Sequence, residues 1–171
     1  MDWARKYSSL CDAPLEAIEK GTRDEDHPAI VFSHYWNDLN GGTMPLRSAV
    51  RPKDIISILK WIMILERKIK NGLDEYFVRL QGTSLVRLTH MSGTGQFLHD
   101  FTSGACYSSR LQAIRSVIKA GKPGFGKAIP GEGGEYSIEV GAGSFPFFLG
   151  DHGIQVFMIA APIKRELRPM L

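Results

Sequence analysis

An Asn-Gly pair at residues 71–72 constrains the fold of this chain more than any other feature. Asn-Gly is a preferred sequence for the two-residue turn that joins antiparallel strands. The unbroken apolar run at residues 61–65 lies before it and is typical of a strand that is packed on both faces. Residues 75–81 follow it and alternate between two faces, as side chains on a strand do. The sequence therefore predicts an antiparallel β-hairpin here, with a charged turn at residues 68–72.

Apolar residues recur at helical spacing in several other segments. We expect a helix over residues 28–39, capped by Asp26 and ended by Gly41-Gly42. A longer helix over residues 103–120 carries the clearest apolar stripe and ends at Gly121. Shorter helical segments are expected at residues 54–59, 83–90 and 97–101.

The last third of the chain is strand-like and interrupted by glycines. Strand patterns occur at residues 125–129, 136–142, 144–149 and 154–161, although the first of these is also compatible with a loop. The loop at residues 150–153 is a second hairpin signal. The predicted order is a helix, two strands, helices and three strands. This order predicts an α+β fold in which helices pack on an antiparallel sheet.

Several motifs of the chain resemble those of the PAS domain family, in particular a bacterial subfamily of stand-alone PAS domains common in alphaproteobacteria. The motifs that carry the resemblance are residues 35–36 (YW), 45–48 (PLRS), 52–55 (PKDI), 76–83 (YFVRLQGT), 85–86 (LV) and 94–98 (TGQFL). The similarity covers residues 28–161, and it implies a PAS-like five-stranded antiparallel sheet with helices on one face. The sequence departs from the subfamily at His99, where an acidic residue is typical.

The chain divides into three parts. We expect an N-terminal extension at residues 1–23, a PAS-like sensor domain at residues 24–163 and a short C-terminal tail at residues 164–171. This tail is too short to be an output domain. The N-terminus has no apolar run of the kind found in signal peptides, and Cys11 and Cys106 are expected to be reduced thiols. A cytoplasmic location is therefore predicted.

Composition and motif spacing argue against several function classes. The chain has 21 Lys and Arg against 18 Asp and Glu, and its net charge of +3 is too small and too dispersed for a nucleic-acid-binding surface. Its apolar runs are far shorter than the roughly 20 residues of a membrane span. The five histidines never come closer than seven residues, so no metal site is predicted.

The resemblance also bears on cofactors. Haem-binding PAS domains supply an axial histidine from the long helix, and residues 103–120 contain no histidine. Flavin photosensors of this fold carry a cysteine in an Asn-Cys-Arg setting, which the sequence lacks. Neither haem nor flavin is therefore expected, and the identity of any other cofactor stays open.

Five residues are candidates for ligand binding: Arg79, Thr83, His90, His99 and Tyr107. Arg79 alternates with apolar neighbours on its strand, so it points either into a pocket or to solvent. In a pocket it would need a carboxylate partner, which a small organic acid could supply. Tyr107 begins the apolar stripe of the long helix and is expected to lie in the core.

The remaining polar residues are assigned to solvent. If Arg79 is exposed, Glu75 or Glu139 is its expected partner, and Arg110 on the long helix is expected to face water. No catalytic residue is predicted, because the neighbouring acid and histidine of the pairs at residues 99–100 and 151–152 point in different directions.

The predicted function is that of a PAS-like signalling protein without its own output domain. It would sense a small organic ligand or act as an adaptor for an unidentified partner protein. A homodimer is expected, through residues 28–39 and the basic rim at residues 67–70. Two alternatives stay open: a small cone-shaped α+β enzyme of isomerase or hydrolase type, and a ligand-free interaction module whose core is filled by the aromatic run at residues 145–148.

Overall fold

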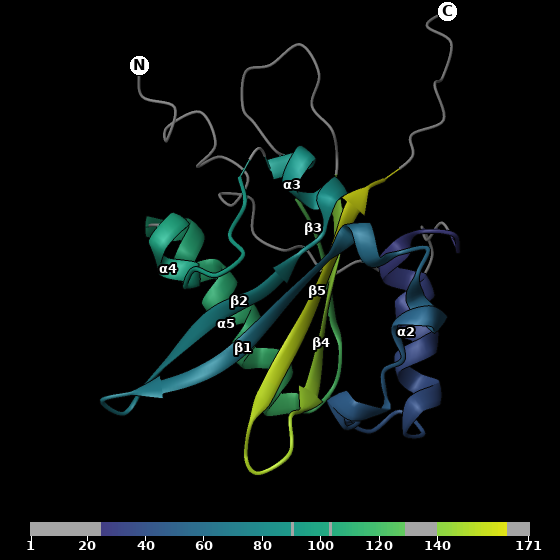
Figure 1. Ribbon diagram of the computed structural model, residues 1–171, viewed down its shortest axis with the longest axis horizontal. Coiled ribbons are helices and arrows are strands. Elements are labelled where there is room, and N and C mark those ends of the chain that lie inside the picture. Colours follow the sequence, from purple (N-terminus) through teal and green to yellow (C-terminus); the bar gives the residue numbers. More distant parts are fainter. Residues whose placement is uncertain (1–24, 90, 103, 129–139, 164–171) are drawn as a thin grey trace, which may run out of the picture.

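A five-stranded antiparallel sheet forms the centre of the computed structural model (Figure 1). The structure describes residues 25–89, 91–102, 104–128 and 140–163. The strands are β1 (Ile62–Lys70), β2 (Leu73–Gln81), β3 (Gly124–Ala128), β4 (Val140–Phe148) and β5 (Ile154–Pro162). They lie in the order β2-β1-β5-β4-β3, so β5 is central. The predicted α+β class with a five-stranded antiparallel sheet is confirmed.

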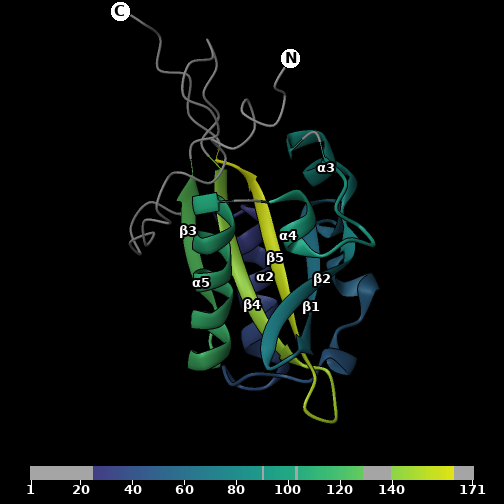
Figure 2. The same ribbon diagram turned by 90° about the vertical axis from the view of Figure 1, so that its left-hand side faces the viewer.

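The helices are divided between the two faces of the sheet, whereas the resemblance implied one face. The described α-helices are α2 (Pro28–Leu39), α3 (Thr83–Thr89), α4 (Leu98–Phe101) and α5 (Gly104–Ala120). Three 3-10 helices lie between α2 and β1: η2 (Arg47–Ala49), η3 (Pro52–Ile55) and η4 (Leu59–Trp61). Helix α2 packs on one face of the sheet, and α4 and α5 lie on the other (Figures 1 and 2).

Both faces of the sheet are covered because both are apolar. Successive side chains on a strand point to opposite faces, so Val156 and Phe157 on β5 enter two separate cores. The core on one face, here called the α2 core, includes Phe32, Trp36, Phe145, Phe147 and Phe157. The core on the other face, here called the α5 core, includes Leu65, Val78, Leu98, Ile114, Val117 and Val156.

The predicted hairpin is present, with a tighter turn than expected. Strand β1 continues as far as Lys70, which pairs with Leu73, so the turn contains only Asn71 and Gly72. Both turn residues have positive φ, 53° and 77°. This is the backbone geometry that a two-residue turn of the I′ type requires, and it explains why Asn-Gly stands there.

Helix α2 has the predicted bounds, but His27 caps it in place of Asp26. The Nδ1 atom of His27 accepts a hydrogen bond from the backbone N–H of Ala29 (3.2 Å). Its Nε2 atom donates to the carbonyl oxygen of Ala161 on β5 (3.0 Å). Further along α2, Trp36 Nε1 donates to the carbonyl oxygen of Pro146 on β4 (3.0 Å). Helix α2 is therefore tied to two strands by buried hydrogen bonds.

Two local predictions are corrected. The strand patterns on either side of Gly143 belong to one strand, β4, and residues 136–139 lie outside the described part of the chain. A Cβ atom at Gly143 would lie 2.7 Å from the Phe145 ring and 3.3 Å from Ala29 Cβ, so the glycine makes room for that ring and for α2 and does not mark a turn. The helix expected at residues 54–59 consists of η3 and the start of η4, and Asp54 lies within η3 instead of capping a helix.

Candidate functional site

Two of the predicted ligand-binding residues lie together beside α5. The His99 ring stacks on Phe97 at 5.5 Å between centroids and meets the Tyr107 ring edge-on at 6.3 Å. His99 is exposed, and its Nε2 lies 3.3 Å from Asp100 Oδ1, so the prediction that these two side chains point in different directions is wrong. Tyr107 is half-buried and packs against the α5 core, as predicted.

The other predicted residues do not join them. Arg79 shares the face of β2 that lies opposite Val78, and its side chain is 55% exposed. Its Nε lies 3.3 Å from Glu66 Oε2, so its partner among the described residues is Glu66 and not the expected Glu75. Glu139, the other expected partner, lies outside the described residues. Thr83 is exposed at the start of α3, and His90 lies outside the described residues.

Glu66 joins three polar side chains on the α2 side of the sheet. The hydrogen bond from Lys68 lowers the pKa of Glu66, and contacts with Gln155 and Arg79 lower it further. Gln155 Nε2 donates to Glu66 Oε2 at 3.4 Å. The Glu66 carboxylate therefore balances the charge of Arg79, which does not require a carboxylate from a ligand.

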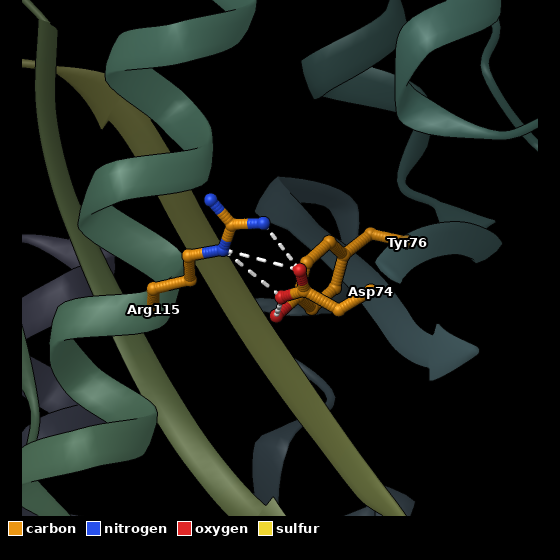
Figure 3. Close-up of polar contacts among 3 residues, drawn as sticks. All are labelled: Asp74, Tyr76 and Arg115. Carbon is orange, nitrogen blue, oxygen red and sulfur yellow. Dashed lines mark hydrogen bonds and ion pairs between the residues drawn. The ribbon is translucent and has the colours of Figure 1, made fainter. Parts of the chain in front are cut away.

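A salt bridge between α5 and β2 was not predicted from the sequence (Figure 3). Arg115 Nε donates to Asp74 Oδ1 and Oδ2 at 3.2 and 3.1 Å, and Arg115 Nη2 also contacts Oδ1. Tyr76 donates its hydroxyl hydrogen bond to Asp74 Oδ2 at 2.8 Å. We call Asp74, Tyr76 and Arg115 the Asp74 clamp. Alternation along β2 places Asp74 and Tyr76 on the same face, so their proximity is predictable from the sequence. The pairing of Asp74 with Arg115 is not, because the two residues are 41 positions apart.

The contacts within the clamp shift the pKa values of Asp74 and Tyr76 in opposite directions. The hydrogen bonds from Arg115 hold the pKa of Asp74 at about 2, below its ordinary 3.8. Burial, followed by the hydrogen bond to Asp74, raises the pKa of Tyr76. Asp74 is thus a carboxylate at neutral pH and fixes one side of α5 to the β1–β2 hairpin.

The sheet beneath the other side of α5 is made of small residues. We call them the small-residue floor: Gly124, Gly126, Ala142, Ser144 and Ala160. Gly126 pairs with Ala142 and Ala142 with Ala160, which gives one cross-strand row; Gly124 and Ser144 form the next. A Cβ at Gly124 would lie 2.9 Å from Val117 Cγ1, which places this face of the sheet against α5.

The small-residue floor is incompletely covered. Ala142 and Ala160 are only half-buried, although β4 and β5 are inner strands of the sheet. Ser144 is 8% exposed. No residue in the described ranges forms a hydrogen bond with its side chain. The floor therefore has accessible surface, and the Ser144 hydroxyl has no hydrogen-bond partner among the described residues.

Arg110 was predicted to face water, but it is half-buried and lies on the side of α5 that carries the buried Ile114 and Val117. A helix turns by about 100° per residue, which directs Arg110 between Ile114 and Val117, the buried residues of α5. Burial lowers the pKa of the Arg110 guanidinium. Among the residues that the structure describes, none forms a hydrogen bond or ion pair with it. The sequence contained a sign of this position: Arg110 stands four residues before Ile114, which is the spacing of residues on one side of a helix.

Two classes of feature are absent from the described residues. They contain no cluster of three or more His, Cys, Asp or Glu side chains that could hold a metal ion. No helix in the same ranges combines the length and the apolar character needed to cross a membrane.

Comparison with known proteins gives one family. A sequence model of the PAS domain matches residues 25–123, which run from just before α2 to the turn that follows α5. The match spans more than half of the 171 residues. No curated protein matches the chain significantly.

Proposed function

The chain belongs to the PAS domain family, and from this premise we propose that it is a signalling protein that senses a small ligand between α5 and the sheet. The observation that carries the proposal is the accessible small-residue floor. Ala160 lies on the central strand and still keeps accessible surface on the α5 side. Ligand sites are concave and mostly apolar with a few polar groups, and small side chains in the middle of a sheet are compatible with such a site.

The aromatic side chains support ligand binding over a filled interior. Phe145 and Phe147 alternate with Ser144 and Pro146, and both phenylalanines are fully buried in the α2 core. Phe148, at the end of β4, is 45% exposed. The aromatic run at residues 145–148 therefore fills the α2 core and does not occupy the floor beneath α5.

Helix α5 is placed to transmit binding. One face of it covers the floor, and its Arg115 is bound to Asp74 on β2. A ligand that shifts α5 would strain the Asp74 clamp, and the β1–β2 hairpin would respond. Interfaces of packed elements change between discrete arrangements, so a small displacement can produce such a response.

An adaptor that binds a partner protein is the second candidate, and an exposed apolar patch favours it. Leu46 is 54% exposed and Phe148 45% exposed, and the two residues are bridge partners beside Leu149. Exposed apolar patches mark interaction sites when they are contiguous. The homodimer through residues 28–39 and 67–70, the subfamily, the cytoplasmic location and the lack of catalysis remain our proposals in either case.

Native mass spectrometry of the purified full chain, together with an absorption spectrum, tests the proposal. We expect a small bound mass, and we expect Ala160→Leu to remove it because the new side chain fills the floor. Val31→Ala, on the exposed side of α2, is the matched control and should keep the mass. Circular dichroism checks that Ala160→Leu folds, with Ala142→Val as a milder variant.

The opposite result has a clear form. An unliganded mass in the wild type, together with no binding from a small-molecule library, would overturn the sensor. Oligomers that dissociate in a Leu46→Asp variant would then favour the adaptor.

A further inference from the structure

We propose that the end of the β1–β2 hairpin docks on the surface of an anionic membrane. The pairing of Glu66 with Gln155 is the last one between β1 and β5. Beyond it, β1 pairs with β2 alone in the described part of the chain, and the two strands project from the body of the molecule (Figure 1). We call this projecting part, residues 67–76, the β1–β2 tip. The inference is independent of a ligand beneath α5, and it leaves residues 28–39 for the proposed homodimer.

Two aliphatic side chains beside the turn are largely exposed. Ile69 is 70% exposed and Leu73 is 68% exposed. Ile69 pairs with Asp74, and Lys70 pairs with Leu73, so the two aliphatic residues are neighbours at the end of the hairpin. Alternation places Ile69 on the α5 side of the sheet and Leu73 on the α2 side. The β1–β2 tip therefore presents apolar surface on both of its faces.

Cationic side chains flank these aliphatic residues on both faces. Arg67 shares the face of Ile69, whereas Lys68 and Lys70 share the face of Leu73. Lys68 contacts Glu66. Arg67 and Lys70 have no ion-pair partner among the residues that the structure describes. Their charges are therefore available to an external anion.

The acidic residues of this part of the sheet are outnumbered. Asp74 is bound by Arg115, and Glu66 is shared by Lys68 and Arg79. Residues 66–76 together with Arg79 and Arg115 contain five cationic side chains and three acidic ones, which leaves an excess of two positive charges. Each Lys or Arg near an anionic lipid surface strengthens binding about fivefold. The charge of the β1–β2 tip is thus complementary to such a surface.

The placement of the aliphatic residues favours lipid over a protein partner. A flat protein surface laid against the hairpin would bury only Ile69 or only Leu73, because they lie on opposite faces. Lipid surrounds the end of the hairpin and buries both. Arg67 lies three residues from Lys70, about 10 Å along the strand. The cations are therefore within the depth to which interfacial segments enter the headgroup region, and their long side chains can extend toward the phosphates.

The β4–β5 turn provides a second apolar point at the same end of the sheet (Figure 1). Strand β5 begins beside the far end of β1, so the turn before β5 and the β1–β2 turn lie at one end. Phe148 and Leu149 are exposed there. This turn also contains Asp151, so we expect the β1–β2 tip to make the stronger contact with anionic lipid.

Co-sedimentation of the full chain with lipid vesicles tests the inference. The vesicles contain phosphatidylcholine alone or an equimolar mixture of phosphatidylcholine and phosphatidylglycerol. We expect binding to the mixed vesicles only, and weaker binding at about 0.5 M salt because the charges are screened. The double variant Ile69→Ser/Leu73→Ser should weaken binding at least about tenfold, since two apolar side chains are lost. Lys70→Gln should weaken it about fivefold.

Matched controls come from the segment before β1, which packs on the α2 core away from the tip. Ile56 is 73% exposed and Lys53 is exposed, so Ile56→Ser and Lys53→Gln should leave binding unchanged. Leu73→Trp should bind at least as tightly as the wild type, because tryptophan favours the membrane interface. Its emission should shift to shorter wavelength when mixed vesicles are added. Thermal unfolding shows whether each variant folds.

Several results would overturn the inference. They are the absence of binding to mixed vesicles, equal binding to both vesicle types, unchanged binding of a folded Ile69→Ser/Leu73→Ser variant, or an equal loss in Ile56→Ser. A homodimer that this double variant dissociates, without any vesicle binding, would assign the tip to a second copy of the chain. The small-ligand proposal is tested separately, because Ala160→Leu leaves the tip intact and should retain vesicle binding.

Discussion

Breaking the Asp74 clamp should loosen α5 from the β1–β2 hairpin by a measurable free energy. The perturbation is Asp74→Asn, which removes the charge and keeps an acceptor for the Tyr76 hydroxyl. Arg115→Gln removes the other charge, and the double variant completes a cycle. The local pair Arg51–Asp54, three residues apart on an exposed turn, provides the control cycle.

The magnitude follows from the pKa of Asp74. A value of about 2 against an ordinary 3.8 corresponds to about 2 kcal/mol in favour of the charged folded state. Because the Arg115 side chain is 50% exposed, solvent screens much of this energy. We expect a coupling of about 1 kcal/mol at pH 7 for the clamp, and less than about 0.5 kcal/mol for the control pair.

The dependence on pH has a definite sign. The folded-state pKa of Asp74 is below that of the unfolded chain, so the unfolded state binds more protons between about pH 4 and pH 2. The clamp therefore stabilises the fold fully above about pH 4, loses about half of its contribution near pH 3, and loses the rest below about pH 2. Urea unfolding of the four proteins of the cycle at pH 7 and pH 3 measures both quantities. A coupling near zero at pH 7, or one that does not fall at pH 3, would refute the reasoning.

Two further substitutions test how the helices and strands are joined. Gly82→Ala would place a Cβ atom 2.5 Å from the carbonyl oxygen of Leu59 and against that of Lys60. Since these are backbone atoms, we expect the free energy of unfolding in urea to fall by at least about 2 kcal/mol. A decrease as small as that of the control Ser84→Ala would contradict this packing. His27→Ala removes the cap of α2 and the bond to Ala161 and should cost about 2 kcal/mol. His27→Ser keeps a cap and should recover part of that loss, and equal stability of the two variants would show that the cap contributes nothing.

Local elements were predictable where one strong signal acts alone. The bounds of α2 follow from its apolar spacing and the glycines after it, and the hairpin follows from the Asn-Gly pair with positive φ at both residues. Gly143 misled the prediction because a glycine that makes room for the Phe145 ring and for α2 looks, in sequence, like one that makes a turn. Only the packed structure distinguishes the two.

The candidate site was less predictable, because its residues depend on which core each face enters. Alternation on β2 shows that Arg79 and Val78 point to opposite faces, but it does not show which face lies beneath α5. The helical position of Arg110 between Ile114 and Val117 was readable in the sequence, yet its charge outweighed the spacing in the prediction. The pairing of Asp74 with Arg115 joins segments 41 residues apart, and no local pattern reports it.

The outer edge of β2 has a consequence for how the protein behaves in solution. Val78 donates its N–H to the carbonyl oxygen of Gln96 and accepts a hydrogen bond from the N–H of Gly95, both at 2.9 Å. An uncovered outer strand is a template on which other chains add strands and aggregate. The N–H and C=O groups of Val78 that point away from β1 are therefore already hydrogen-bonded to residues 95–96 of the same chain. A second molecule can add a strand there only if these two hydrogen bonds break. The middle of β2 is thereby protected against edge-to-edge aggregation.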